Sequence, residues 1–285
     1  MTAPEVWSPS RVLTYRSCPR QEFLRYRRGV HTPTAVAETP GVVASTPETA
    51  TKLRLGTISH AGLEAAYRAA VERAHPQPDP GGRMSAFARE AMDAIDAAWD
   101  RLGMPDEGVD GYELNLSIQS EVFDVLARLP VPRPSAVLGV EHELVVPTPS
   151  GRMMRGVLDL ALQIGHDAVH IRDWKRKRLR NLPRSTELPR DDAMAFYAYA
   201  VRLSWPWVKR VSVGLYSTLD NREVTADVPF PVAREVVIGH DVLAEKAEGD
   251  RENRPTPDGS NCTYCSVRVD CPLWTRLEIE SPEPA

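Results

Sequence analysis

The chain has 285 residues, of which 42% are hydrophobic and 26% are charged, and its formal net charge is −4 at pH 7. This balance is that of a globular protein, and it excludes a disordered, collagen-like or membrane-embedded chain. A negative net charge argues against a protein that coats nucleic acid by bulk charge, but it leaves room for a local basic groove. Because the N-terminus lacks a signal-peptide pattern and no apolar run is long enough to span a membrane, we expect a cytoplasmic protein with no membrane partner.

The first half of the chain has the apolar spacing of helices. Ser8-Pro9 supplies an N-cap followed by a first-turn proline, and Cys18-Pro19 interrupts the helix that follows. Residues 31–50 have little periodicity and predict a flexible loop, after which Gly56 is expected to open a longer helix. The predicted helices therefore cover residues 8–16, a segment ending near 28, and residues 56–74, 84–102 and 112–128.

The apolar spacing changes after residue 130 to the alternation typical of strands. Helical spacing returns twice, once between strands and once after the last of them. This order predicts an α/β or α+β core with a helical section before its sheet. The elements expected are strands at 136–146, 153–164 and 168–174, a helix at 190–203, strands at 208–218 and 222–228, a helix at 231–252, and an irregular tail at 254–272.

Two acidic residues stand at predicted strand ends, Asp159 after Gly156 and Asp173 at the start of Asp173-Trp174-Lys175. If the strands are neighbours, the carboxylates meet and need a cation between them, and oxygen ligands favour magnesium or manganese. Lys175 shares a face with Asp173, because side chains two apart on a strand point the same way. It is then able to orient a water or stabilise phosphate charge. The competing interpretation is two surface acids and a solvated lysine, because D-x-K is a common pattern.

Other acidic and imidazole side chains extend this set. His60 and Glu64 are i,i+4 neighbours on one face of the helix predicted at 56–74. Glu141 lies among apolar residues of the first predicted strand, where a charge is costly unless it is paired or bound to metal. Glu143 has the same parity as Glu141, so either acid fits the role, and a lone helical histidine is more often structural or solvated.

The four cysteines form a pattern typical of a metal site. Cys262, Cys265 and Cys271 make a C-x2-C-x5-C motif, and Cys18 stands near the other end of the chain. Disulfides are uncommon in the cytoplasm, whereas thiolates suit zinc or an iron–sulfur cluster. One remote cysteine with a local group of three favours iron–sulfur over zinc, which more often uses two local pairs, and over free thiols.

Taken together, these motifs resemble the RecB-like branch of the PD-(D/E)XK nuclease superfamily. The closest resemblance is to the four-cysteine CRISPR-associated exonucleases and the AddB-type nuclease domains that carry a [4Fe-4S] cluster. It implies an α/β fold with a mixed central sheet flanked by helices, preceded by a helical section, and a cluster joining the N- and C-terminal segments. The implied organisation is one nuclease domain over residues 1–285, with cluster-binding segments at 1–30 and 254–275, a helical section at 56–130 and a catalytic core at 136–252.

The resemblance also implies residue roles and a substrate. The implied substrate is DNA, either single-stranded or duplex with free ends, and it is hydrolysed from its ends. The implied context is DNA repair or recombination, phage DNA processing or CRISPR adaptation, with a recombination or adaptation protein as a partner. The alternative is a non-catalytic DNA-binding iron–sulfur module of such a complex. The implied site has His60, Asp159 and Asp173 as ligands of Mn or Mg, Trp174 as a ligand through its backbone oxygen, Lys175 as the catalytic lysine and Glu141 as the acid of the first core strand.

The chain departs from the family pattern beside this site. The family often has Gln four residues before a Tyr on the next helix; here Tyr197 takes the place of the Tyr, but position 193 is Ala. A basic run follows the catalytic lysine instead of the usual Thr, and phosphate contacts are expected from it. The expected DNA-binding residues are Arg176, Lys177, Arg178 and Tyr197, with Tyr15, Tyr26 and Trp174 as stacking surfaces for unpaired bases.

Overall fold

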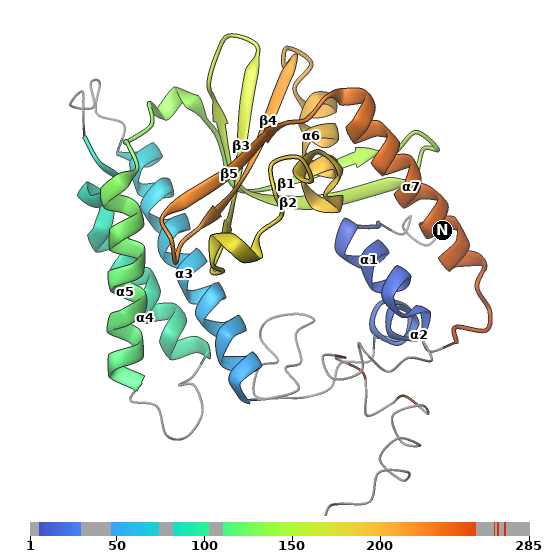
Figure 1. Ribbon diagram of the computed structural model, residues 1–285, viewed down its shortest axis with the longest axis horizontal. Coiled ribbons are helices and arrows are strands. Elements are labelled where there is room, and N and C mark those ends of the chain that lie inside the picture. Colours follow the sequence, from blue (N-terminus) through green and yellow to red (C-terminus); the bar gives the residue numbers. More distant parts are fainter. Residues whose placement is uncertain are drawn as a thin grey trace, which may run out of the picture.

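The computed structural model describes residues 6–29, 47–73, 82–102 and 111–254 and the single residues 265, 267 and 271. In this part of the chain a five-stranded sheet has the order β1-β2-β3-β4-β5 and carries helices on both faces (Figure 1). Strands β3 and β4 are parallel and the other neighbours are antiparallel. The strands are β1 (Val137–Pro147), β2 (Met153–Gln163), β3 (Ala168–Lys175), β4 (Arg210–Ser217) and β5 (Arg222–Asp227).

The helices confirm the mixed α/β fold expected from the sequence, including a helical section before the sheet. Ser8 caps the first helix as predicted, with its side chain accepting from the Arg11 amide. Among the described residues no helix is both long and apolar enough to cross a membrane. The helices are α1 (Pro9–Ser17), α2 (Pro19–Glu22), α3 (Pro47–Glu72), α4 (Ala88–Leu102), α5 (Gly111–Arg128), α6 (Asp192–Ser204) and α7 (Phe230–Gly249), and a π-helical turn, Phe23–Arg27, follows α2.

The expected start of α3 at Gly56 was wrong, because the helix already begins at Pro47. Gly56 is inside it, and a Cβ there would meet no atom within 4 Å, so no close packing requires glycine. Glycine costs a helix interior only about 1 kcal/mol relative to alanine, and the packing of the later turns outweighs this. Residues 47–50 of the expected loop are therefore helical, and the rest of that loop lies outside the described residues.

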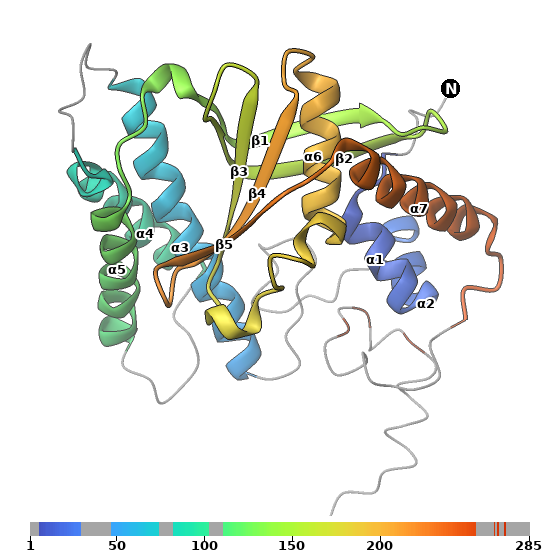
Figure 2. The same ribbon diagram turned by 45° about the horizontal axis from the view of Figure 1, so that its top comes forward.

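Two hydrophobic layers enclose the sheet (Figure 2). Helices α3, α4 and α5 pack together on one side and reach the sheet through Leu160, Trp174 and Tyr216. Helices α1, α6 and α7 pack on the other side, where Phe196 is among the fully buried side chains. Helix α6 makes the crossover that a parallel β3–β4 pair requires, and its N-cap Asp191 accepts hydrogen bonds from two backbone amides.

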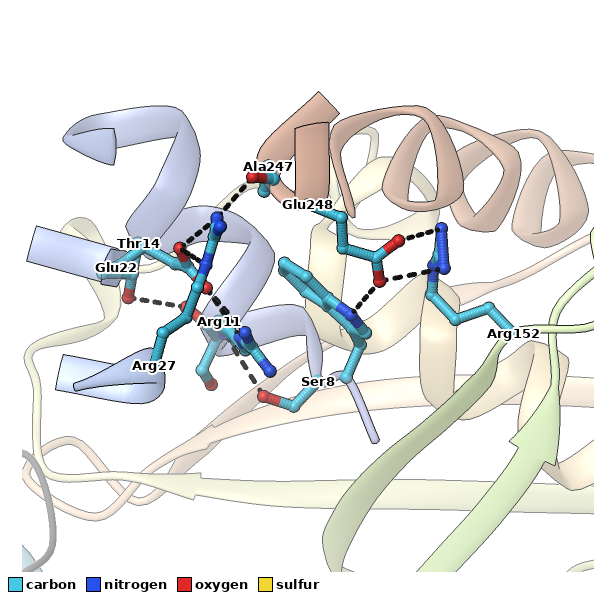
Figure 3. Close-up of polar contacts among 10 residues, drawn as sticks. Ser8, Arg11, Thr14, Glu22, Arg27, Arg152, Ala247 and Glu248 are labelled. Carbon is cyan, nitrogen blue, oxygen red and sulfur yellow. Dashed lines mark hydrogen bonds and ion pairs between the residues drawn. The ribbon is translucent and has the colours of Figure 1, made fainter. Parts of the chain in front are cut away.

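The N-terminal segment is fastened to the end of α7 by buried polar contacts (Figure 3). Glu22 is fully buried and accepts hydrogen bonds from Arg11 and Arg27, so its charge is paired. Arg27 also donates to the Ala247 carbonyl, and the Trp7 indole donates to Glu248 at 2.9 Å. These contacts hold α1 and α2 against α7, far apart in sequence but adjacent in space.

Candidate active site

Three acidic residues form one row across three neighbouring strands. The pairs Val140↔Leu160 and His142↔Leu158 place Glu141 of β1 opposite Asp159 of β2. The β2–β3 register, continued by one residue beyond the pair Leu160↔Arg172, places Asp159 beside Asp173. Side chains in one row of a sheet share a face, so the three carboxylates converge there.

His60 of α3 closes over this row. Its Nε2 is 2.7 Å from the carbonyl oxygen of Trp174, and its Nδ1 is 3.5 Å from Asp159 Oδ2. The same Asp159 oxygen accepts a hydrogen bond from the Trp174 amide at 2.7 Å. The helix and two strands therefore meet through a closed set of polar contacts at the end of β3.

The donor set fits a divalent cation. One ligand atom from each of His60, Glu141 and Asp159 lies within 4.8 Å of the other two, and hard oxygen ligands with one imidazole suit magnesium or manganese. Asp173 adjoins them in the row and forms an ion pair with Lys175. The sequence-predicted set of His60, Glu141, Asp159, Asp173, Trp174 and Lys175 is thus brought to one place.

Burial and repulsion between carboxylates raise the pKa values of two carboxyl groups in the row, Asp159 and Glu141. Burial first, and then repulsion by Asp173, raise the pKa of Asp159 well above its ordinary value. Burial, followed by the charge of Glu64, raises the pKa of Glu141 to about 7. A bound cation relieves both penalties, because it compensates the charge that burial and repulsion disfavour.

The two basic groups of the site are shifted in opposite directions. Burial, and then the positive charge of Lys175, lower the pKa of His60, which favours the neutral imidazole that binds metals. Burial on its own lowers the pKa of Lys175, but Asp173 and Asp159 outweigh it and raise that pKa above its ordinary value. Lys175 therefore carries a positive charge at neutral pH.

Glu141 has an unusual backbone for a strand residue. Its φ is +46°, in the left-handed region that non-glycine residues seldom occupy. Such a conformation costs of order 1–3 kcal/mol and persists only where surrounding contacts fix it. The distortion coincides with the acid row.

A buried polar network lies on the opposite face of β3. Glu223 of β5 accepts two hydrogen bonds from Arg172, both at 2.8 Å, and contacts His170 Nε2 at 2.9 Å. Trp174 packs on this face between Tyr67 and Tyr216 and is only 2% exposed. The network supports the strand that carries Asp173.

The expected stacking role is wrong for Trp174 and Tyr15, because both side chains are buried and have no open face for a base. Alternation along β3 gives the reason for Trp174. Asp173 points toward the acid row, so its neighbour points into the α3–α5 core. Tyr15 is packed in the other core, and its hydroxyl donates to Asp250 at 3.2 Å.

The basic run after β3 is tied to acids of other elements. Arg176 donates to Glu121 of α5 at 2.9 Å, and Arg178 donates to Asp220 at 2.7 Å, whereas Lys177 is exposed. Glu121 is a residue that the sequence reasoning missed. The signal available was a charge on the mainly apolar face of the helix predicted at 112–128.

Tyr197 of α6 lies close to the acid row. Burial, and then the charge of Asp173, raise the pKa of its hydroxyl. A Cβ at Gly156 would come within 2.9 Å of its ring, so glycine gives that ring room beside β2. The structure places Tyr197 where it faces the site.

Three of the four cysteines fall among the described residues. Cys265 and Cys271 are buried, and Cys18 stands at the junction of α1 and α2. Cys265 and Val267 form a buried cluster with Leu24, in the π-helical turn that follows α2. Cys265 and Val267 therefore lie against the N-terminal segment that contains Cys18, while Cys262 lies outside the described residues.

Comparison with known proteins adds an independent finding. No curated protein matches the sequence significantly. Among solved structures, the chain is similar to one titled "Crystal structure of SSO0001", with 16% identity, a TM-score of 0.32, and coverage of 74% of this chain and 96% of that one. The sequence profile of the PD-(D/E)XK nuclease superfamily matches residues 6–272, from the first described residue to the one after Cys271. Since that match spans nearly the whole chain and includes every residue of the acid row, the chain belongs to the PD-(D/E)XK nuclease superfamily.

Proposed function

We propose that the protein is a divalent-metal-dependent DNA exonuclease that hydrolyses phosphodiester bonds from DNA ends. The observation that carries this proposal is the row of Glu141, Asp159 and Asp173, with His60 above it and Lys175 beside it. Membership of the nuclease superfamily supports the chemistry. The context we propose is repair or recombination, phage DNA processing or CRISPR adaptation, with a protein partner from that context.

The chain's own residues define what the site does. His60, Glu141, Asp159 and Asp173 would hold the metal, together with the Trp174 carbonyl. When bound, Mg²⁺ or Mn²⁺ supplies a water of lowered pKa and neutralises charge on the scissile phosphate.

Lys175 contributes a fixed positive charge. Its ion pair with Asp173 holds the ammonium at the edge of the row, where it is placed to orient the attacking water and to stabilise the charge that develops on the phosphate. Asp173 thus has two tasks, because it adjoins the metal-binding set and also positions Lys175.

DNA is proposed to reach the site along the segment after β3. Lys177 is exposed there, and Arg176 and Arg178 are held by Glu121 and Asp220, which fixes where their guanidinium groups lie. Tyr197 is proposed to face the DNA strand from α6. Phosphate contacts of this kind give affinity without sequence preference.

A [4Fe-4S] cluster is proposed on Cys18, Cys262, Cys265 and Cys271. Thiolates are the ligands that such clusters use. The packing of Cys265 and Val267 against Leu24 supports this ligand set, because it brings the tail to the segment that contains Cys18. The proposed cluster is structural: it joins the two ends of the chain around the nuclease core.

The test of nuclease function uses full-length protein purified without oxygen and supplied with Mn²⁺. End-labelled linear DNA, single-stranded and duplex, is compared with covalently closed circles. We expect linear DNA to be shortened from its ends and circles to stay intact. Lys175→Met and Asp173→Asn should lose cutting, whereas Lys209→Met, at an exposed lysine before β4, should keep it.

Three results would contradict parts of this proposal. Equal cutting of circles and linear DNA would exclude an exonuclease while leaving a nuclease. DNA binding without hydrolysis, unchanged by Asp173→Ala, would support the non-catalytic module instead. A colourless protein that contains zinc and no iron would exclude the iron–sulfur cluster.

A further inference from the structure

Arg68 is not among the predicted site residues, yet it contacts the strand that carries Glu141. It lies on α3 two turns after His60, and its Nε donates to Glu64 at 2.7 Å. Its Nη2 donates to the carbonyl oxygen of Val140 at 3.2 Å. Helix α3 therefore touches all three acid-bearing strands, β2 and β3 through His60 and β1 through Arg68.

The Val140 carbonyl belongs to the peptide from which the Glu141 side chain is turned. The φ angle of Glu141 sets the orientation of its side chain relative to the preceding peptide plane, and that plane contains the Val140 carbonyl. This φ is +46°, while Val140 and His142 on either side keep their pairs with β2, so the left-handed backbone at Glu141 leaves the pairing of its neighbours intact. The hydrogen bond from Arg68 to the Val140 carbonyl thus holds the Val140–Glu141 peptide in place. The orientation of the Glu141 side chain is set relative to that peptide.

Glu64 adds to this arrangement by holding the Arg68 guanidinium. With Nε bonded to a carboxylate one turn back on the same helix, the planar group has a fixed direction and its Nη2 faces β1. The spacing of His60, Glu64 and Arg68 at intervals of four places all three on one face of α3.

We propose that Arg68 is a positioning residue that fixes the Val140–Glu141 peptide and thereby aims the Glu141 carboxylate at the metal site. The inference rests on the proposed function, because it assigns Arg68 a task toward the metal that Glu141 would help to hold. Arg68 acts through Glu141 and does not itself touch the reacting atoms.

The test measures Mn²⁺ affinity of the full-length protein by titration calorimetry without DNA, together with the melting temperature of the metal-free protein. Arg68→Met should weaken Mn²⁺ binding by roughly 10- to 100-fold, the range seen when a group supporting a metal ligand is removed. Its melting temperature should change little, because the Arg68 side chain is half-exposed. Arg68→Lys, which keeps a donor, should recover part of the affinity.

Arg73→Met is the matched control. Arg73 follows the end of the same helix and, within the described part of the chain, its side chain forms an ion pair with Glu90 of α4, away from β1. Its Mn²⁺ affinity should equal that of the wild type. Glu141→Gln should weaken binding like Arg68→Met, and the double variant Arg68→Met/Glu141→Gln should bind no more weakly than Glu141→Gln alone.

The outcomes separate this inference from the proposed function. If the wild type binds Mn²⁺ and Glu141→Gln loses it while Arg68→Met does not, the positioning role is overturned and the nuclease proposal stands. Normal Mn²⁺ affinity with weakened DNA binding would make Arg68 a phosphate contact and would also overturn it. If the wild type and Asp159→Asn both fail to bind Mn²⁺, the proposed function fails first.

Discussion

Glu223 should make stability depend on acid pH, because it is a largely buried carboxylate held by three contacts with Arg172 and His170. Burial raises its pKa, but the hydrogen bonds from His170 and Arg172 outweigh burial and lower the pKa from 4.5 to about 2. A pKa difference of roughly 2.5 corresponds to about 3 kcal/mol of unfolding free energy. Because the folded-state pKa is the lower one, this stabilisation is complete well above pH 4.5 and is lost as the pH falls toward 2.

The perturbation is Glu223→Gln, followed by urea unfolding at pH 7 and pH 3.5. At pH 7 the variant should be at least about 3 kcal/mol less stable, because the substitution also leaves the largely buried Arg172 without its carboxylate. At pH 3.5 the difference in free energy of unfolding between wild type and variant should be smaller by about 1.4 kcal/mol. The reason is that protonation of Glu223 at this pH removes about that amount of its stabilisation from the wild type. The exposed Glu187→Gln, which affects only surface contacts with the Arg184 side chain and amide, should change the free energy of unfolding by less than about 1 kcal/mol at both pH values.

Either of two results would refute this reasoning. A difference between wild type and Glu223→Gln that stays constant with pH would show that Glu223 does not titrate with a lowered pKa. A variant as stable as the wild type at pH 7 would show that the contacts with Arg172 and His170 contribute nothing net.

Three further changes have expected outcomes. Gly214→Ala would place a Cβ in overlap with Glu223 Oε1, so it should lower the free energy of unfolding in urea by about 1–3 kcal/mol, and by less in a Glu223→Ala background. Gly156→Ala would place a Cβ 2.7 Å from the Phe196 ring and should lower stability by a similar amount and reduce nuclease activity. Cys18→Ser should lower both the iron content and the melting temperature of the purified protein, if the proposed cluster joins the chain ends.

Controls for these changes come from the same chain. Gly239→Ala is in an exposed turn of α7 where a Cβ would meet nothing within 4 Å, so it should raise stability by up to about 1 kcal/mol. A loss of stability equal to that of Gly156→Ala would contradict the packing argument. Retained iron and unchanged melting in Cys18→Ser would contradict the cluster, and Ser10→Ala, at an exposed position of α1, should leave both unchanged.

Local patterns in the sequence were enough to predict most of the fold. The change from helical spacing to alternation near residue 130 predicts all five strands and the helices around them, because one face of each element must be buried. The Ser8 cap and the Cys18-Pro19 interruption are equally local, and both appear in the structure. The start of α3 was mispredicted because a single glycine is a weak signal beside tertiary packing.

The candidate site was only partly readable in this way. Motif spacing singled out the residue types of the acid row, since Asp173 and Lys175 two apart on a strand must share a face. Strand register alone, however, brings Glu141, Asp159 and Asp173 into one row, because pairing between strands depends on contacts far apart in sequence.

The tertiary structure also decided which side chains are available to a substrate. Alternation along β3 buries the Trp174 ring between Tyr67 and Tyr216, although its backbone lies at the site. The pairing of Arg176 with Glu121, and the reach of Arg68 to the strand that carries Glu141, join residues of different elements. Such contacts depend on how a helix packs against a sheet. Composition and spacing in the sequence therefore identify the candidate residues, but only the tertiary packing determines which side chains contact each other.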